Sequence, residues 1–174
     1  MKNLKFISQD TEMALIQEMS YKIKMSDWNI HPSDTCFLCV SPDYSSIVTQ
    51  HLSHSLSMGR EIFHIEAVNV PFPDEDALEY KISFEINFAE WCRKWKTFVL
   101  CEAGVIRGGN YTWITNSMKK ITKCDENYRK SHYYTLSLCE NIHSKFKSDL
   151  VSLYYDDEIE DLHFWWERPN NHWT

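Results

Sequence analysis

Glycine and proline are scarce in this chain of 174 residues, which contains four of the former and five of the latter. This scarcity excludes collagen-like and low-complexity sequences. Since 43% of the residues are hydrophobic and 14% aromatic, we expect a packed core rather than a disordered chain. The length is that of one domain, so a single domain over residues 1–174 is predicted.

The sequence also has no excess of positive charge and no long apolar run. Eighteen Lys and Arg stand against 25 Asp and Glu, which gives a formal net charge of −7. A field of this sign repels nucleic acid and anionic membrane surfaces. Neither a run of about 18 apolar residues nor a secretory signal is found. We therefore expect a cytoplasmic protein with no nucleic acid or membrane partner.

The six cysteines are enough for three disulfides, but most lie in apolar, strand-like runs: Cys36, Cys39, Cys92, Cys101, Cys124 and Cys139. A chain of this size folds without covalent cross-links, so reduced and buried thiols are the better interpretation. Cys36 and Cys39 have the spacing of a redox or zinc pair. On a strand, however, residues three apart face opposite sides, and such a pair is rejected.

Strand-like and helix-like segments alternate along the chain. Short apolar runs predict strands over residues 36–40, 62–70, 97–101, 133–139 and 150–154, and helical spacing predicts helices over 12–23, 42–56 and 113–121. Asp10 or Thr11 is available as a cap for the first helix, and Ser41 for the second. This alternation predicts an α/β fold with a mainly parallel sheet flanked by helices.

Residues 71–95 are expected to leave this sheet. A proline-containing break covers residues 71–76, and between Tyr80 and Phe88 apolar residues alternate with polar ones. A period of two is typical of a half-exposed antiparallel strand. We predict a small mobile hood here, and a separate acidic and aromatic segment over residues 156–174.

Three of the four glycines, Gly104, Gly108 and Gly109, lie between a predicted strand and the helix that follows it. At the carboxyl end of a parallel strand, a helix N-terminus directs unpaired N–H groups at a ligand, and glycine lets the backbone close around a phosphate. The predicted phosphate-binding residues are Arg107, Gly108, Gly109, Asn110, Tyr111 and Thr112. A tight turn with an incidental arginine would explain the same pattern.

Glu102 stands at the end of the same predicted strand. A carboxylate there can ligate Mg²⁺, which prefers oxygen donors and substrate phosphates, or it can cap the loop. His51 and His54 share one side of a predicted helix, but no third metal ligand is indicated. The acidic run over residues 156–161 is typical of a solvated turn. The aromatic residues near the C-terminus are more often core or subunit contacts than a surface for stacking a base.

Residues 98–110, FVLCEAGVIRGGN, resemble the phosphoribosyl pyrophosphate motif of the type I phosphoribosyltransferases. That motif consists of a hydrophobic strand, two acids, two hydrophobic residues and a phosphate loop. Residues 132–139 and 158–169 are similar to the last strands and the Trp-containing ending of xanthine and guanine phosphoribosyltransferases. The resemblance covers residues 30–169.

The resemblance implies a phosphoribosyltransferase-like fold that binds a phosphorylated ribose or a nucleotide, with Mg²⁺ as cofactor and a purine as the base. It implies that Glu102 is the catalytic carboxylate beneath the ribose and the Mg²⁺ ligand. The loop from Arg107 to Thr112 would hold the 5′-phosphate, and Phe164 and Trp165 would form the wall against the base. We also expect a homo-oligomer.

Five positions depart from the pattern of the family. Ala103 replaces the second acid, Asp43 lies in the loop that would hold pyrophosphate, and Cys139 replaces the purine-recognising lysine. Arg107 and Asn110 stand where the phosphate loop of the family has Thr. Three functions are therefore considered. The protein transfers phosphoribose to or from a nucleobase, or it is a catalytically inactive nucleotide-sensing or protein-interaction module, or it hydrolyses the glycosidic bond of a nucleotide.

Overall fold

The computed structural model describes residues 2–57, 61–70, 77–124 and 131–167. The elements in chain order are β1 (Asn3–Ile7), α1 (Gln9–Met25), β2 (Thr35–Val40), α2 (Pro42–Leu56), β3 (His64–Val68), α3 (Ala77–Lys94), β4 (Thr97–Val105), α4 (Gly109–Cys124), β5 (His132–Asn141), β6 (Leu150–Tyr155) and β7 (Glu160–Phe164).

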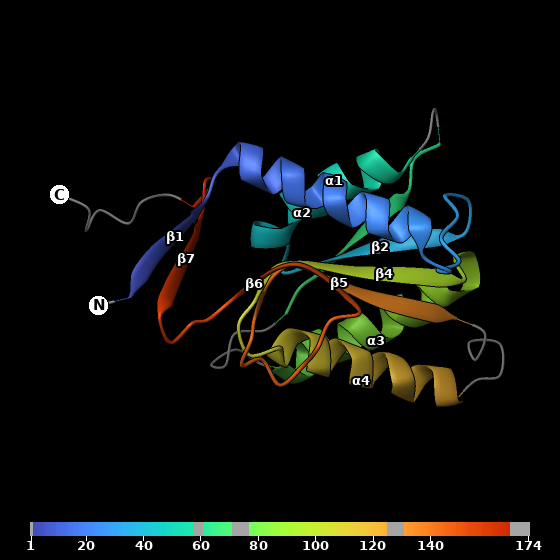
Figure 1. Ribbon diagram of the computed structural model, residues 1–174. Coiled ribbons are helices and arrows are strands. Elements are labelled where there is room, and N and C mark those ends of the chain that lie inside the picture. Colours follow the sequence, from blue (N-terminus) through green and yellow to red (C-terminus); the bar gives the residue numbers. More distant parts are fainter. Residues whose placement is uncertain (1, 58–60, 71–76, 125–130, 168–174) are drawn as a thin grey trace.

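Five of the strands form one parallel sheet in the order β3-β2-β4-β5-β6. Helices α1 and α2 cover one face of this sheet, and α3 and α4 cover the other (Figure 1). The predicted α/β fold with a parallel sheet flanked by helices is therefore confirmed. Since parallel strands joined by helices all point the same way, their carboxyl ends meet at one edge of the sheet.

Each face of the sheet carries its own hydrophobic core. On the first face Ile16 of α1 and Leu52 of α2 pack with the strand residues Phe37, Val99 and Leu136. The second core joins residues of α3 and α4 to the alternate positions of the same strands: Phe88, Trp91, Ile114, Met118, Cys36, Leu38, Phe98 and Leu100. Every residue of β2 is buried, as expected for a strand covered on both sides.

Helix α1 begins earlier than the sequence predicts. Its N-cap is Ser8, whose side chain accepts a hydrogen bond from the backbone N–H of Thr11. The predicted caps Asp10 and Thr11 lie inside the helix. An acid in the first turn is favourable beside the partial positive charge of a helix N-terminus, so Asp10 suits its place there.

The predicted strand over Tyr80–Phe88 is wrong, because these residues belong to helix α3. Phe84, Phe88 and Trp91 are buried and recur four and three positions apart, whereas Ile82 and Ile86, two other apolar residues of the alternating pattern, are about half exposed or more. A spacing of four fits a helix as well as a strand, so alternation alone was misleading. The described part of the predicted hood is thus a helix packed on the main sheet, and residues 71–76 lie outside the described residues.

A second, two-stranded sheet lies beside the main one and joins segments from the two ends of the chain (Figure 1). Strand β1 pairs with β7 in parallel, from Asn3 opposite Glu160 to Ile7 opposite Phe164. Lys5 and Glu160 form an ion pair across this sheet at 3.0 Å. Neither strand was predicted, and together they place Phe164 next to the main sheet.

None of the described helices is long and apolar enough to cross a membrane. All six cysteines are free thiols, and Cys36, Cys39, Cys101 and Cys139 are buried. Burial raises the pKa of each of these four thiols, so they are neutral at physiological pH. Cys36 faces the core beneath α3 and α4, whereas Cys39 lies near Thr49 of α2, as residues three apart on a strand should.

Candidate functional site

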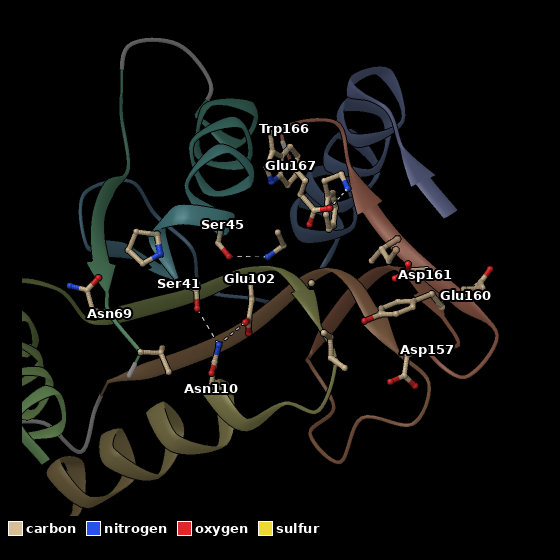
Figure 2. Close-up of a pocket in the computed structure, with 18 of the residues that line it drawn as sticks. Ser41, Ser45, Asn69, Glu102, Asn110, Asp157, Glu160, Asp161, Trp166 and Glu167 are labelled. Carbon is tan, nitrogen blue, oxygen red and sulfur yellow. Dashed lines mark hydrogen bonds between the residues drawn. The ribbon is translucent and has the colours of Figure 1, made fainter. Parts of the chain in front are cut away.

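A pocket of about 860 Å³ opens at the carboxyl edge of the five-stranded sheet (Figure 2). Its described lining comes from the carboxyl ends of β2, β3, β4 and β6, from the first turns of α2, α3 and α4, and from β7 and the residues after it, with Lys2 before β1. In an open parallel sheet this edge is where ligands bind. The small β1–β7 sheet closes one side of the pocket, which explains why residues from the end of the chain reach it.

Glu102 is the buried carboxylate of this pocket. It lies near the carboxyl end of the central strand β4, and its side chain accepts a hydrogen bond of 2.9 Å from Nδ2 of Asn110 in the first turn of α4. Burial raises the pKa of Glu102 from 4.5 to about 7, and the hydrogen bond from Asn110 opposes this effect in part. A carboxyl group with such a pKa exchanges its proton near neutral pH.

Ser41 connects this carboxylate to the neighbouring strand. The same Nδ2 of Asn110 lies 3.1 Å from Oγ of Ser41, so Asn110 bridges the ends of β2 and β4 (Figure 2). Ser41 has φ of 55° and makes no side-chain cap for α2, although the sequence suggested one. A non-glycine residue in the left-handed region is strained, and such strain is concentrated at functional sites.

The turn that follows Ser41 also contacts β4. Oγ of Ser45 accepts a hydrogen bond of 3.0 Å from the backbone N–H of Ala103, so that N–H is already satisfied. The Ala103 side chain is buried in the core beneath α1 and α2 and also borders the pocket. The second acid implied by the resemblance is therefore absent at a position that touches the pocket. Position 139 offers no lysine either, since the Cys139 thiol is buried in the same core.

Acidic side chains dominate the charge of the pocket. The described lining residues include one cation, Lys2, and five acids: Glu102, Asp157, Glu160, Asp161 and Glu167. The acidic run over residues 156–161 was predicted to be a solvated turn. Part of it, in the turn after β6 and in β7, lines the pocket. Of these, Glu160 is neutralised by its ion pair with Lys5. An anionic ligand would need an accompanying cation here.

The glycine loop turns from β4 into α4 at Gly108. This residue has φ of 75°, and a Cβ atom built on it would lie 2.3 Å from Cβ of Phe146. Only glycine fits, because both the conformation and the close approach exclude a side chain. Helix α4 then begins, and its first internal hydrogen bond runs from the Thr112 N–H to the Gly108 carbonyl at 3.0 Å. The N–H groups of Gly109, Asn110 and Tyr111 precede this bond, as in any helix N-terminus.

The predicted phosphate-binding residues do not all line the pocket. Asn110 lines the pocket and Gly109 has open space where a Cβ would stand. Arg107 is exposed and lies beside the pocket-lining residue Ile106, but it does not itself line the pocket. Thr112 is exposed, and its hydroxyl donates to the Gly108 carbonyl at 2.9 Å.

Tyr111 is a core residue rather than a phosphate ligand through its side chain. Its ring is fully buried, and its hydroxyl donates to backbone carbonyls of Leu100 and Leu136 in β4 and β5. Burial raises the pKa of this phenol well above its usual value, so it stays neutral. The sequence analysis placed Tyr111 in the phosphate loop, whereas it lies in the first turn of α4. The helical geometry, which turns position 111 toward the sheet, was not visible in the loop motif.

The aromatic wall of the pocket consists of Phe164 and Trp166. Their rings are stacked at 4.5 Å with 16° between their planes, and the Phe164 ring lies 3.6 Å from the position of a Cβ on Gly104. Trp165, predicted as a base-binding residue, is not among the described lining residues and points to α1 instead. Trp165 and Trp166 lie in the turn after β7, where the Glu167 N–H donates to the Phe164 carbonyl at 3.0 Å, so the alternation of a strand does not decide which of them faces the pocket.

No family model and no curated protein matches this sequence. Solved structures do match it. The xanthine-guanine-hypoxanthine phosphoribosyltransferase of Helicobacter pylori superposes with a TM-score of 0.64 at 13% identity, over 95% of this chain and 93% of that one.

Two further similar structures contain nucleotides. One is a hypothetical protein from Neisseria gonorrhoeae with bound ppGpp, with a TM-score of 0.58 at 14% identity, over 98% of this chain and 92% of that one. The other is the hypoxanthine phosphoribosyltransferase of Trypanosoma cruzi in complex with the product IMP, with a TM-score of 0.55 at 12% identity, over 84% of this chain and 69% of that one. At such identities the likeness establishes the fold, which is that of the purine phosphoribosyltransferases.

Proposed function

We propose that this protein binds a phosphorylated ribose or a nucleotide in the pocket at the carboxyl edge of its main sheet, and that it transfers phosphoribose between pyrophosphate and a purine base. The observation that carries the proposal is Glu102. A buried carboxylate with a pKa of about 7, at the end of the central strand and inside a pocket of about 860 Å³, is what a binding or catalytic site requires. The nucleotides held by two structural neighbours support the same ligand class.

The first turn of α4 is the proposed phosphate site. Its free N–H groups and the positive end of the helix dipole favour an anion, and Gly109 leaves room for one. Arg107 is exposed next to this turn and has a long, flexible side chain. We assign the 5′-phosphate of the ligand to the Gly109–Thr112 turn, with Arg107 as its cation.

The residues of the pocket fit Mg²⁺. This ion is held in proteins by one or two carboxylates together with substrate phosphates, and Glu102 provides one such carboxylate at the end of β4. Bound there with a diphosphate, Mg²⁺ would neutralise charge on the leaving oxygens. Because acids outnumber cations in the described lining, a polyphosphate ligand should depend on Mg²⁺ more strongly than a monophosphate does.

In the transfer reaction, the bond between C1′ of the ribose and the pyrophosphate oxygen breaks, and a bond from C1′ to a nitrogen of the base forms. The electron pair of the broken bond leaves with pyrophosphate, so the ribose gains positive charge in the transition state. Ionised Glu102 beneath the sugar would stabilise that charge. Phe164 and Trp166 would stack on the base.

Isothermal titration calorimetry tests the binding proposal with ribose 5-phosphate, IMP and phosphoribosyl pyrophosphate, each with and without Mg²⁺. Arg107→Ala should weaken phosphate binding by about 1.5–3 kcal/mol, the range for a hydrogen bond to a charged group. Arg93→Ala is the matched control, because Arg93 is exposed in the last turn of α3. Unchanged affinity in Arg107→Ala would exclude the phosphate assignment.

Turnover is tested separately, by pyrophosphate release from phosphoribosyl pyrophosphate in the presence of guanine, hypoxanthine or xanthine. Glu102→Gln should abolish release while ribose 5-phosphate still binds. Glu18→Gln, an exposed acid of α1 paired with Lys22, is the control. Binding without release in the unaltered protein would favour the nucleotide-sensing function over the transferase.

A further inference from the structure

Glu12 is a buried acid outside the pocket, and it contacts the segment that carries the aromatic wall. It lies in the first turn of α1 with a side chain that is fully buried. Its Oε2 accepts a hydrogen bond from Nε1 of Trp165, the residue between Phe164 and Trp166. A buried hydrogen bond to a carboxylate is among the stronger ones in proteins.

His51 of α2 lies beside the other carboxylate oxygen of Glu12. Its Nδ1 is 3.4 Å from Oε1 of Glu12, and both atoms are buried without a hydrogen-bond partner. A proton on His51 Nδ1 would satisfy both atoms at once. Glu12 therefore joins three separate parts of the chain, namely α1, α2 and the segment after β7.

Trp165 contacts both Glu12 and the pocket-lining residue Trp166. Its indole meets that of Trp166 edge to face at 5.7 Å, and Trp166 in turn stacks on Phe164. The Trp165 backbone N–H donates to the Ile7 carbonyl at 3.0 Å, which ties the same residue to β1. Since Phe164 and Trp166 line the pocket and Trp165 does not, Trp165 is the attachment point of the wall.

The groups facing Glu12 come from each element packed against it. His51 faces it from α2, Trp165 from the segment after β7, and Cys139 from β5. Burial raises the pKa of Cys139 to about 12, so this thiol is neutral, and Lys5 near it is paired with Glu160. Burial also raises the pKa of Glu12, although Trp165 and His51 favour its charged form.

We propose that Glu12 is a positioning residue for the aromatic wall: its carboxylate holds Trp165 in place, and through it Phe164 and Trp166, so that protonation of Glu12 loosens the wall and weakens ligand binding. The part that concerns ligand affinity rests on the proposed function. As pH falls, Glu12 gains a proton, its oxygens accept less strongly from the indole N–H, and the wall loses its anchor.

The test uses fluorine NMR of the full chain labelled with 5-fluorotryptophan, in which the Trp165 and Trp166 resonances are assigned by Trp165→Phe and Trp166→Phe. In the unaltered protein the Trp166 resonance should shift as Glu12 gains its proton with falling pH. Glu12→Gln keeps an acceptor for the indole but has no proton to gain, so its Trp166 resonance should stay constant with pH. Glu12→Ala should shift or broaden it at every pH, and Glu18→Gln is the control that leaves it unchanged.

Trp165→Phe removes the indole donor of the same hydrogen bond. It tests whether this bond positions the wall if Glu12→Ala does not fold. Both variants should bind ribose 5-phosphate or IMP about tenfold more weakly, since one charged hydrogen bond corresponds to at least this factor. Glu12→Gln is neutral like protonated Glu12, so it should bind at every pH about as weakly as the unaltered protein does at low pH. A Trp166 resonance in Glu12→Ala that is identical to that of the unaltered protein would overturn the proposal, as would an unchanged ligand affinity of Trp165→Phe. If no variant binds ligand, including the unaltered protein, the proposed function fails, while the NMR data still decide whether Glu12 positions the wall.

Discussion

Replacing Glu102 by glutamine should make the stability of the protein less dependent on pH, in a direction that the structure fixes. The carboxyl group is buried beneath the pocket, where desolvation disfavours its charged form. Glutamine has nearly the same shape, can still accept the hydrogen bond from Asn110, and has no proton to lose. The difference between the two proteins therefore isolates the ionisation of one side chain.

The magnitude follows from the pKa of Glu102, which rises from 4.5 to about 7 in the folded protein. Between these values the folded state retains a proton that the unfolded state has lost, so the free energy of unfolding falls as pH rises. Each pKa unit corresponds to about 1.4 kcal/mol, which gives about 3 kcal/mol over the whole window. Above a pH of about 7 the loss is complete, and below 4.5 it is absent.

Urea unfolding of both proteins at several pH values between about 4.5 and 8 measures this difference. Relative to the unaltered protein, Glu102→Gln should gain about 3 kcal/mol across the window. Glu12 also has a raised pKa, but it is present in both proteins and cancels in the comparison. A difference that stays constant with pH, or one that falls as pH rises, would refute the assignment of Glu102 as a buried acid with a pKa near neutrality.

Further outcomes are expected at positions where geometry is most restrictive. Gly108→Ala should destabilise the protein by more than about 1 kcal/mol in thermal unfolding, because its φ of 75° and the approach of Phe146 both exclude a Cβ, whereas Gly109→Ala, with open space, should have little effect. Equal stability of the two variants would contradict this. Amide hydrogen exchange of Phe84 to Trp91 should be slow like that of β4, because α3 packs on the main sheet, and fast exchange there would instead support the mobile hood expected from the sequence. Mg²⁺ should bind more weakly below a pH of about 7, since the Glu102 carboxylate must lose its proton to bind a cation, and calorimetry at pH values on both sides of 7 checks this.

The main sheet was predictable because the continuous apolar sequences of its strands indicate burial on both faces. Continuous apolar runs such as residues 36–40 and 97–101 have no polar face, and in a chain of this composition only a strand covered on both sides explains them. Glu102 was predictable for a related reason, since an acid that ends such a run must lie at the edge of the sheet. The network that Asn110 and Ser41 form around it was not, because it joins residues 69 positions apart.

The errors arose where one pattern suits two structures. In α3 the buried Phe84 and Phe88 are four apart, a spacing that is even and therefore also keeps one face of a strand, whereas the next buried residue, Trp91, is three positions further on and fits the helix. Strands β1 and β7 have mixed, partly exposed sequences, and their pairing is decided by contacts between the ends of the chain rather than by local propensity. Trp166 was missed as a lining residue because it lies in the turn after β7, where the alternation of a strand no longer determines which side chain faces the pocket.

The pairing of β1 with β7 also has a consequence for how the protein is made. Lys5 and Glu160, which pair across this sheet, are 155 positions apart in the chain. At ribosomal rates of about 5–20 residues per second, β1 waits about 8 to 30 s for its partner strand to be synthesised. During that interval the five-stranded sheet can assemble in part, but the wall that carries Phe164 has not left the ribosome. The nascent chain therefore completes the pocket last, and a ribosome-bound fragment that stops before β7 should fold its sheet yet lack the wall of this pocket.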